Sequence, residues 1–230
     1  MSRNSPSNIR RRRALGDYGR GERDRDDARR QVAYLAARLM AEEGITDYGQ
    51  AKQKAARQAG FLDSKALPDN GEIEAALREY QALYQAEEHV ELLAELRELA
   101  VAVMHLLAEF EPRLTGPVLD GTATAFSPVE LELFTDSEKD VELFLINRNI
   151  PYKTGERQRA HGGVGRETLS VLHCHYREVP VVLVVRPFND LRVVDKRGAA
   201  GAQASRADAA AVEALLAGMA GEKDKAPNLG

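Results

Sequence analysis

Two closely spaced glutamates are the first residues whose type and spacing could do chemistry. Glu130 and Glu132 lie within 129–134, where apolar and acidic residues alternate with the period of two that is typical of a β-strand. Their side chains therefore point to one face, about 6.6–6.8 Å apart along the strand. They could hold one divalent ion weakly with the help of water ligands. The alternative interpretation is that both line the wet face of a half-buried strand.

Histidines beside the single cysteine form a second group of candidate ligands. His173 and His175 flank Cys174 on a predicted strand, so both imidazoles share one face and could bind zinc or copper if Glu178 completed the site. A polar strand face is the alternative. The glycine-rich segment 161–166 has no predicted strand before it and no P-loop lysine, and it therefore predicts a flexible hairpin loop.

A longer motif over 114–137 connects the acidic strand to two glycines. Gly116 and Gly121 are five residues apart, and Ser127 comes shortly before the acidic residues. The motif is similar to the signature of the nucleotidyltransferase superfamily, whose fold is shared with polymerase beta and the minimal nucleotidyltransferases. The stretches GTA, LFTDS and KDVELFL resemble most a group of uncharacterised bacterial proteins that carry this domain behind a helical N-terminal half. The resemblance covers the chain from about Asp27 to Arg192.

This resemblance implies a chemistry for the motif. Members of the superfamily transfer a nucleotidyl group from a nucleoside triphosphate to an acceptor with the help of Mg²⁺, and the acceptor is unknown here. Gly116 and Gly121 would form the turn that approaches the triphosphate, and Ser127 would be the third nucleotide-binding residue. Glu130, with Glu132 as a shifted partner, would be catalytic and would bind the metal.

The chain departs from the family pattern at three positions. Pro117 stands where the turn has a serine, and Pro128 stands at the first strand carboxylate. The third carboxylate is expected at about Val182, in a strand without any acid. Because Glu130 is the ligand that remains in place, we predict that transfer is impaired or lost. The competing hypothesis is a non-catalytic scaffold or a module that binds a partner or a nucleotide.

The elements that must position these residues predict an α+β fold, in which a helical N-terminal domain precedes a small mixed sheet with covering helices. Periodicity predicts a first helix from Asp27 and a helix with a long apolar stripe that ends before Pro112. We expect that stripe to pack against neighbouring helices. The predicted segments are a basic, disordered arm (1–25), a helical domain (26–111), an α/β domain (112–195), and a linker with a C-terminal helix and loose tail (196–230).

Composition excludes several classes of protein. The chain has 230 residues, of which 43% are hydrophobic and 30% charged, so a collagen-like or wholly disordered chain is excluded. The apolar runs are shorter than the roughly 20 residues of a membrane span, and with one cysteine we expect a cytoplasmic protein that does not bind membranes. The arm over 1–13 contains arginines and no acid, and it could contact nucleic acid or an acidic partner; a solvated tail is the alternative.

Overall fold

The computed structural model has an α+β fold that divides into two compact units, residues 1–80 and 81–230. Each unit has a hydrophobic core of its own. The structure describes the backbone of residues 6–61, 67–161, 165–192 and 206–223, and the side chains of residues 25–61, 67–158, 167–192 and 206–219.

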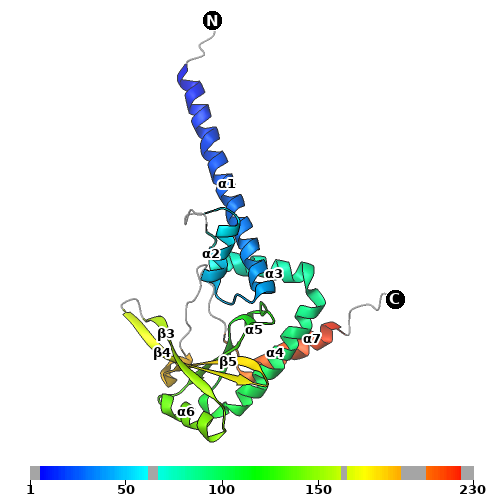
Figure 1. The fold of residues 1–230 in the computed structure, drawn as a ribbon, viewed down its shortest axis with the longest axis vertical. Helices are drawn as coiled ribbons and strands as arrows, with labels where there is room; N and C mark the ends of the chain where they lie inside the picture. Colours follow the sequence, from blue (N-terminus) through cyan, green and yellow to red (C-terminus); the bar gives the residue numbers. More distant parts are fainter. Residues whose placement is uncertain (1–5, 62–66, 162–164, 193–205, 224–230) are drawn as a thin grey trace, which may run out of the picture. The chain divides into compact units, whose positions relative to one another are not determined.

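The first unit is helical and contains α1 (Pro6–Glu43), α2 (Tyr48–Gln58) and most of α3 (Asn70–Tyr84) (Figure 1). α1 begins at Pro6 rather than Asp27, so its backbone runs through much of the segment predicted as a disordered arm. Proline is favoured at the first helical position, and the alanine, leucine and arginines that follow have good helix propensity.

Acidic side chains begin two helices of this unit. Asp47 Oδ1 accepts a hydrogen bond from the backbone N–H of Gln50 at 2.7 Å at the start of α2. Asp69 and Glu72 form a capping box before α3, because each carboxylate accepts from the other's backbone N–H, at 2.9 and 2.7 Å.

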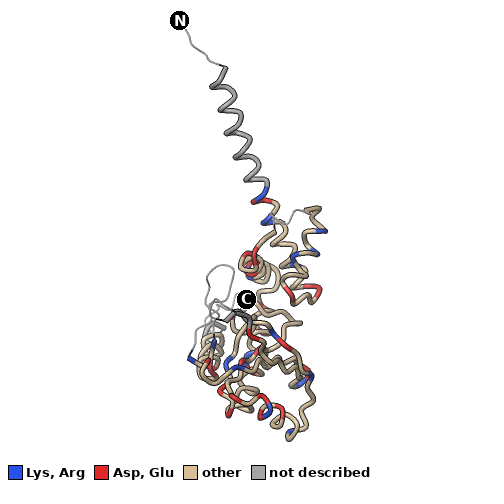
Figure 2. The backbone as a smooth tube through the Cα atoms, turned by 90° about the vertical axis from the view of Figure 1, so that its left-hand side faces the viewer, with Lys and Arg blue, Asp and Glu red and all other residues tan. Residues whose placement is uncertain are grey.

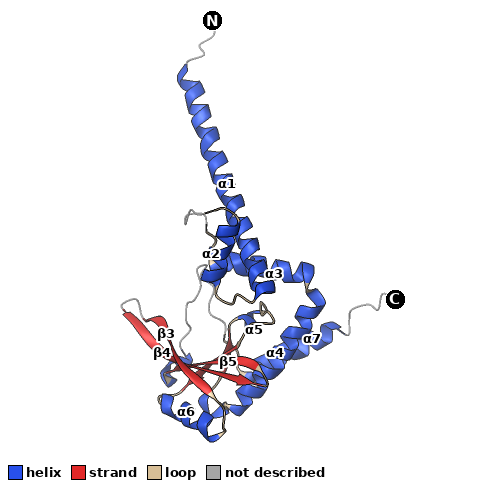
Figure 3. Cartoon of the chain, in the orientation of Figure 1, coloured by secondary structure: helices blue, strands red, loops and turns tan. Residues whose placement is uncertain are grey.

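The second unit is a mixed sheet with the strand order β1-β2-β5-β4-β3 and covering helices (Figure 3). β2 and β5 are parallel neighbours, whereas the other neighbouring pairs are antiparallel. The strands are β1 (Arg113–Thr115), β2 (Val129–Phe134), β3 (Tyr152–His161), β4 (Gly165–Tyr176) and β5 (Val179–Arg186). The helices are α4 (Ala86–Leu106), α5 (Pro117–Asp120), α6 (Glu138–Asn147) and α7 (Ala209–Lys223), with 3-10 turns η2 (Ala108–Phe110) and η3 (Phe188–Arg192).

The sheet has two strands that sequence periodicity did not predict. β3 is polar at most positions, so it has no apolar alternation, and β1 is only three residues long. The glycine-rich segment 161–166 therefore does follow a strand, and β3 and β4 pair as a hairpin around it. Residues 162–164 of the predicted loop lie outside the described residues.

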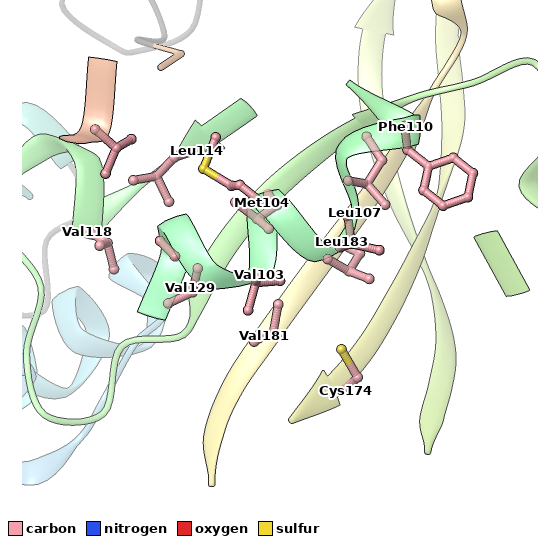
Figure 4. Packing of buried hydrophobic residues seen from close by; sticks show 14 of the residues in the cluster. Val103, Met104, Leu107, Phe110, Leu114, Val118, Val129, Cys174, Val181 and Leu183 are labelled. Atoms are coloured by element: carbon pink, nitrogen blue, oxygen red, sulfur yellow. The ribbon is translucent and has the colours of Figure 1, made fainter. Parts of the chain in front are cut away.

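The core of the second unit joins α4 to one face of the sheet. Val103 of α4 and its C-cap Leu107 belong to the same buried cluster as Val129 of β2 and Val181 and Leu183 of β5 (Figure 4). The expectation that α4 would pack against helices was therefore incomplete, because it packs on strands as well as on α7. This is why the division between the units precedes α4 instead of following it near residue 111.

Charged residues of both signs are interspersed along the described backbone (Figure 2). No helix in the described ranges combines the length and the hydropathy that a membrane span requires.

Candidate functional site

The glycine turn and the acidic strand lie side by side. β1 and β2 pair antiparallel with Thr115 opposite Glu130, so that Gly116 comes directly after the paired residue. Gly116 has a φ of 73° and a ψ of −159°, a backbone conformation that is essentially restricted to glycine. A Cβ atom at this position would lie 3.3 Å from Glu130 Cδ. The structure thus brings together two residues that the motif had singled out.

Glu130 forms an ion pair with an arginine that sequence analysis did not identify. Arg157 Nη1 donates to Glu130 Oε2 at 3.2 Å, and the two side chains are 37% and 22% exposed. Arg157 lies on β3, whose polar sequence carries no strand signal that could have linked it to Glu130. Because a guanidinium stays protonated in proteins, Arg157 puts a permanent positive charge beside this carboxylate.

The strand next to Glu130 is apolar. In the parallel pairing of β2 with β5, Glu130 lies opposite Val182, the position at which the third carboxylate was expected. Val182 is buried in a small cluster with Val184, Leu169 and Val171. On this strand an aliphatic side chain, and not a carboxylate, therefore lies opposite Glu130.

Glu132 is buried in a cluster of ionic groups. Its exposed fraction is 3%, so this part of the strand face is not wet, contrary to the interpretation of a solvated face. Arg186 Nη1 donates to Glu132 Oε1 at 2.8 Å, and Arg206 Nε donates to Glu132 Oε2 at 2.6 Å. Arg186 also pairs with Asp190 at 3.0 Å. Both oxygens of Glu132 thus accept charge-assisted hydrogen bonds, which an incoming cation would have to displace.

The loop between Gly116 and β2 is closed by its own hydrogen bonds. α5 begins at Pro117 and ends at Asp120, and its C-cap is Gly121, which has a φ of 79°. Ser127 Oγ accepts a hydrogen bond from the backbone N–H of Thr124 at 2.9 Å, and Ser127 is buried. In this arrangement Gly121 caps a short helix and Ser127 closes a turn.

Arg97 of α4 donates hydrogen bonds to backbone carbonyl groups of the same loop. Arg97 is buried, and its Nε donates to the carbonyl oxygen of Val118 at 3.1 Å while Nη2 donates to that of Leu119 at 3.2 Å. Burial lowers the pKa of the Arg97 guanidinium from its usual value. A buried charge needs hydrogen-bonding partners. The carbonyl groups of α5 supply them for the Arg97 guanidinium.

Two more side chains donate to carbonyl groups of this loop. His89 Nε2 lies 3.0 Å from the carbonyl oxygen of Gly121, and Gln81 Nε2 donates to that of Ala123 at 3.0 Å. Burial lowers the pKa of His89, and the charge of Arg97 adds to this effect against the opposing hydrogen bond to Gly121. A neutral imidazole that donates from Nε2 fits these surroundings. Local sequence patterns do not reveal this contact, because His89 and Gly121 are 32 residues apart.

The histidines of β4 do not assemble with other ligands among the described side chains. His173 and His175 are exposed, and His173 Nε2 lies 3.2 Å from the position of a Cβ atom on Gly155. Cys174 is buried, and burial raises the pKa of its thiol to about 11. Within the described ranges, no group of three or more His, Cys, Asp or Glu side chains could hold a metal ion.

The arginine side chains of the arm over 1–13 lie outside the described residues, so its predicted contact with nucleic acid or an acidic partner stays a prediction.

Comparisons of the chain with models of protein families, with curated proteins and with solved structures found no match.

Proposed function

We propose that this chain is a nucleotidyltransferase-like protein in which the transfer of a nucleotidyl group from a nucleoside triphosphate is lost or strongly impaired. The observation that carries the proposal is the ion pair between Glu130 and Arg157 next to an apolar Val182. Two divalent ions at a phosphoryl-transfer centre need several converging carboxylates. Here the carboxylate of Glu130 pairs with the guanidinium of Arg157 instead.

Mg²⁺, which the resemblance implies, does not fit the described side chains. A hard divalent cation takes oxygen ligands and keeps several waters, and it binds weakly to one monodentate carboxylate. Binding at Glu130 would have to displace or repel the Arg157 guanidinium 3.2 Å away. At Glu132 it would have to break two hydrogen bonds, one to the buried Arg186 and one to Arg206.

A non-catalytic role as a scaffold or a nucleotide-binding module is the second candidate. It is favoured by the side chains that hold the glycine loop in place, Arg97, His89 and Gln81, because they maintain the loop without contributing an acid. We also propose a cytoplasmic location, which rests on the single cysteine and its burial.

The proposal is tested with the full-length chain, Mn²⁺ and a non-hydrolysable triphosphate analogue. We expect the Mn²⁺ binding detected by electron paramagnetic resonance to be the same in the natural chain and in the Glu130→Gln variant. We also expect no transfer of label from radioactive triphosphates. The double variant Arg157→Ala/Val182→Asp should gain Mn²⁺ affinity, because it removes the internal cation and restores a neighbouring carboxylate.

Glu178→Gln, in the exposed turn between β4 and β5, is the matched control for the loss of one charge. The proposed loss of catalysis would be overturned if the natural chain transferred label and if Glu130→Gln abolished this transfer while Glu178→Gln preserved it.

A further inference from the structure

A polar groove lies beside the β3–β4 hairpin, on the face opposite to Arg157. Its volume is about 490 Å³. Residues of β3, β4 and the first turn of α6 line it: Thr154, Gly155, Glu156, Thr168, Ser170 and Glu138. Side chains alternate along a strand, so Thr154 and Glu156 point away from the face that carries Arg157. The groove is thus separate from the surroundings of Glu130.

The groove is acidic and rich in hydroxyl groups. Glu138 accepts a hydrogen bond from the Ser170 hydroxyl, and Gln158 Nε2 donates to Thr168 Oγ1 at 2.7 Å. An adjoining hollow of about 240 Å³ shares three of these residues and adds Asp136 and Glu167, together with Arg186, which is buried and paired with Glu132 and Asp190. A ligand with phosphate groups would be repelled here, whereas a lysine or arginine side chain would find carboxylate and hydroxyl acceptors.

β3, which forms one wall of the groove, is also the edge of the sheet. It pairs with β4 on one side, and no strand among the described residues pairs with its other side. An edge strand presents backbone N–H and C=O groups that can accept a further strand. An extended segment added there would run directly along the groove, with every second side chain directed into it.

In two antiparallel registers, a second copy of β3 would be a poor occupant of this edge. Antiparallel pairing centred on Gly155 places Lys153 of one copy opposite Arg157 of the other, and pairing centred on Glu156 places the two Glu156 side chains opposite each other. Like charges directly opposite one another destabilise a strand pair. The edge therefore favours a segment of different charge pattern.

We propose that the edge of β3 binds an extended segment of a partner protein as an additional strand, with lysine or arginine side chains at alternate positions in the groove. Backbone hydrogen bonds supply the pairing, and Glu138 and Glu156 supply the preference for basic side chains. The proposal names a class of partner for the chain. It does not depend on whether nucleotidyl transfer is lost, because it uses another surface and its test contains no triphosphate.

The probe is a fluorescein-labelled peptide of ten residues in which lysine and threonine alternate, titrated with the full-length chain by fluorescence anisotropy. We expect saturable binding that the double variant Glu138→Gln/Glu156→Gln weakens by about tenfold or more, which is about 1.4 kcal/mol. The matched control Glu98→Gln/Glu178→Gln removes two exposed acids from α4 and the β4–β5 turn and should leave the affinity unchanged. Circular dichroism checks that all variants are folded.

A second measurement separates strand addition from simple charge attraction. The same peptide is also made in two forms with N-methyl groups on alternate amides, one form for each edge of the peptide strand. A methylated amide cannot donate a backbone hydrogen bond, so we expect the form whose methylated edge faces β3 to bind far more weakly. Hydrogen exchange should slow in β3 when the unmodified peptide is added. The proposal is overturned if the unmodified peptide does not bind, if both methylated forms bind as well as it does, or if the control variant weakens binding equally.

Discussion

Individual acidic residues on β2 have different partners although they are two residues apart. Glu130 is partly exposed and pairs with Arg157, whereas Glu132 is 3% exposed and pairs with Arg186 and Arg206. Arginine suits both places because its planar guanidinium donates several hydrogen bonds and keeps its charge when buried. At the residue scale, arginines therefore balance the acids of this strand.

The buried cluster predicts a large cost for a small substitution. Glu132→Gln keeps the shape of the side chain but removes the charge that faces Arg186, whose side chain is fully buried, and Arg206. Breaking a buried ion pair by removing one partner costs about 3–5 kcal/mol. We expect a loss of this size in the free energy of unfolding, measured by urea denaturation.

Glu111→Gln is the matched control for that experiment. Glu111 pairs with Arg113 at 3.3 Å, and its side chain is 49% exposed. Exposed pairs contribute about 0–1 kcal/mol, so this variant should stay close to the natural chain. Equal losses in the two variants would show that burial does not strengthen the cluster around Glu132.

At the scale of elements, the position of the glycine loop depends on β1, which the sequence did not reveal. The three residues of β1 pair with β2 and carry the chain to Gly116 directly above Glu130. α4 then holds the loop through Arg97 and His89, which bind its carbonyl groups. A strand and a helix together thus determine where the loop lies.

The surroundings of Gly116 in the loop and of Gly218 in α7 predict opposite outcomes for their substitution by alanine. Gly116→Ala introduces a Cβ atom 3.3 Å from Glu130 Cδ at a φ of 73°, and such a strained residue costs about 1–3 kcal/mol. Gly218→Ala lies in α7 with no atom within 4 Å of the new Cβ, and should stabilise the chain by up to about 1 kcal/mol. Thermal unfolding of both variants measures the difference, and a neutral Gly116→Ala would contradict the crowding at this turn.

At the scale of the whole molecule, the two larger hydrophobic clusters belong to different units. Leu39 lies in the cluster formed by α1, α2 and α3, and Leu131 lies in the cluster formed by α4 and the sheet. Both side chains are at most 1% exposed. Separate cores of this kind are expected to open as separate cooperative units.

Two core substitutions test this independence. Leu39→Ala and Leu131→Ala should each destabilise the chain by about 2–5 kcal/mol, because each leaves a cavity in a close-packed core. Native-state hydrogen exchange followed by mass spectrometry in low urea should show faster exchange in α2 for the first variant and in β5 for the second. Faster exchange in both units for both variants would indicate a single cooperative core.

Much of the fold followed from local patterns in the sequence. Alternation of apolar and acidic residues predicted β2. The α+β class and the helical N-terminal half were also predicted correctly. β3 escaped because a polar edge strand has neither apolar periodicity nor a run of β-branched residues.

The sequence by itself determined which acids are present: Glu130 and Glu132 lie on one predicted strand, and the predicted strand around Val182 contains no acid. Only the tertiary structure decided what faces Glu130 and Glu132, because Arg157, Arg186 and Arg206 come from segments 27, 54 and 74 residues away. Spacing in a sequence reports the direction of a side chain along its own helix or strand. The partner that a side chain meets is set by how distant elements pack.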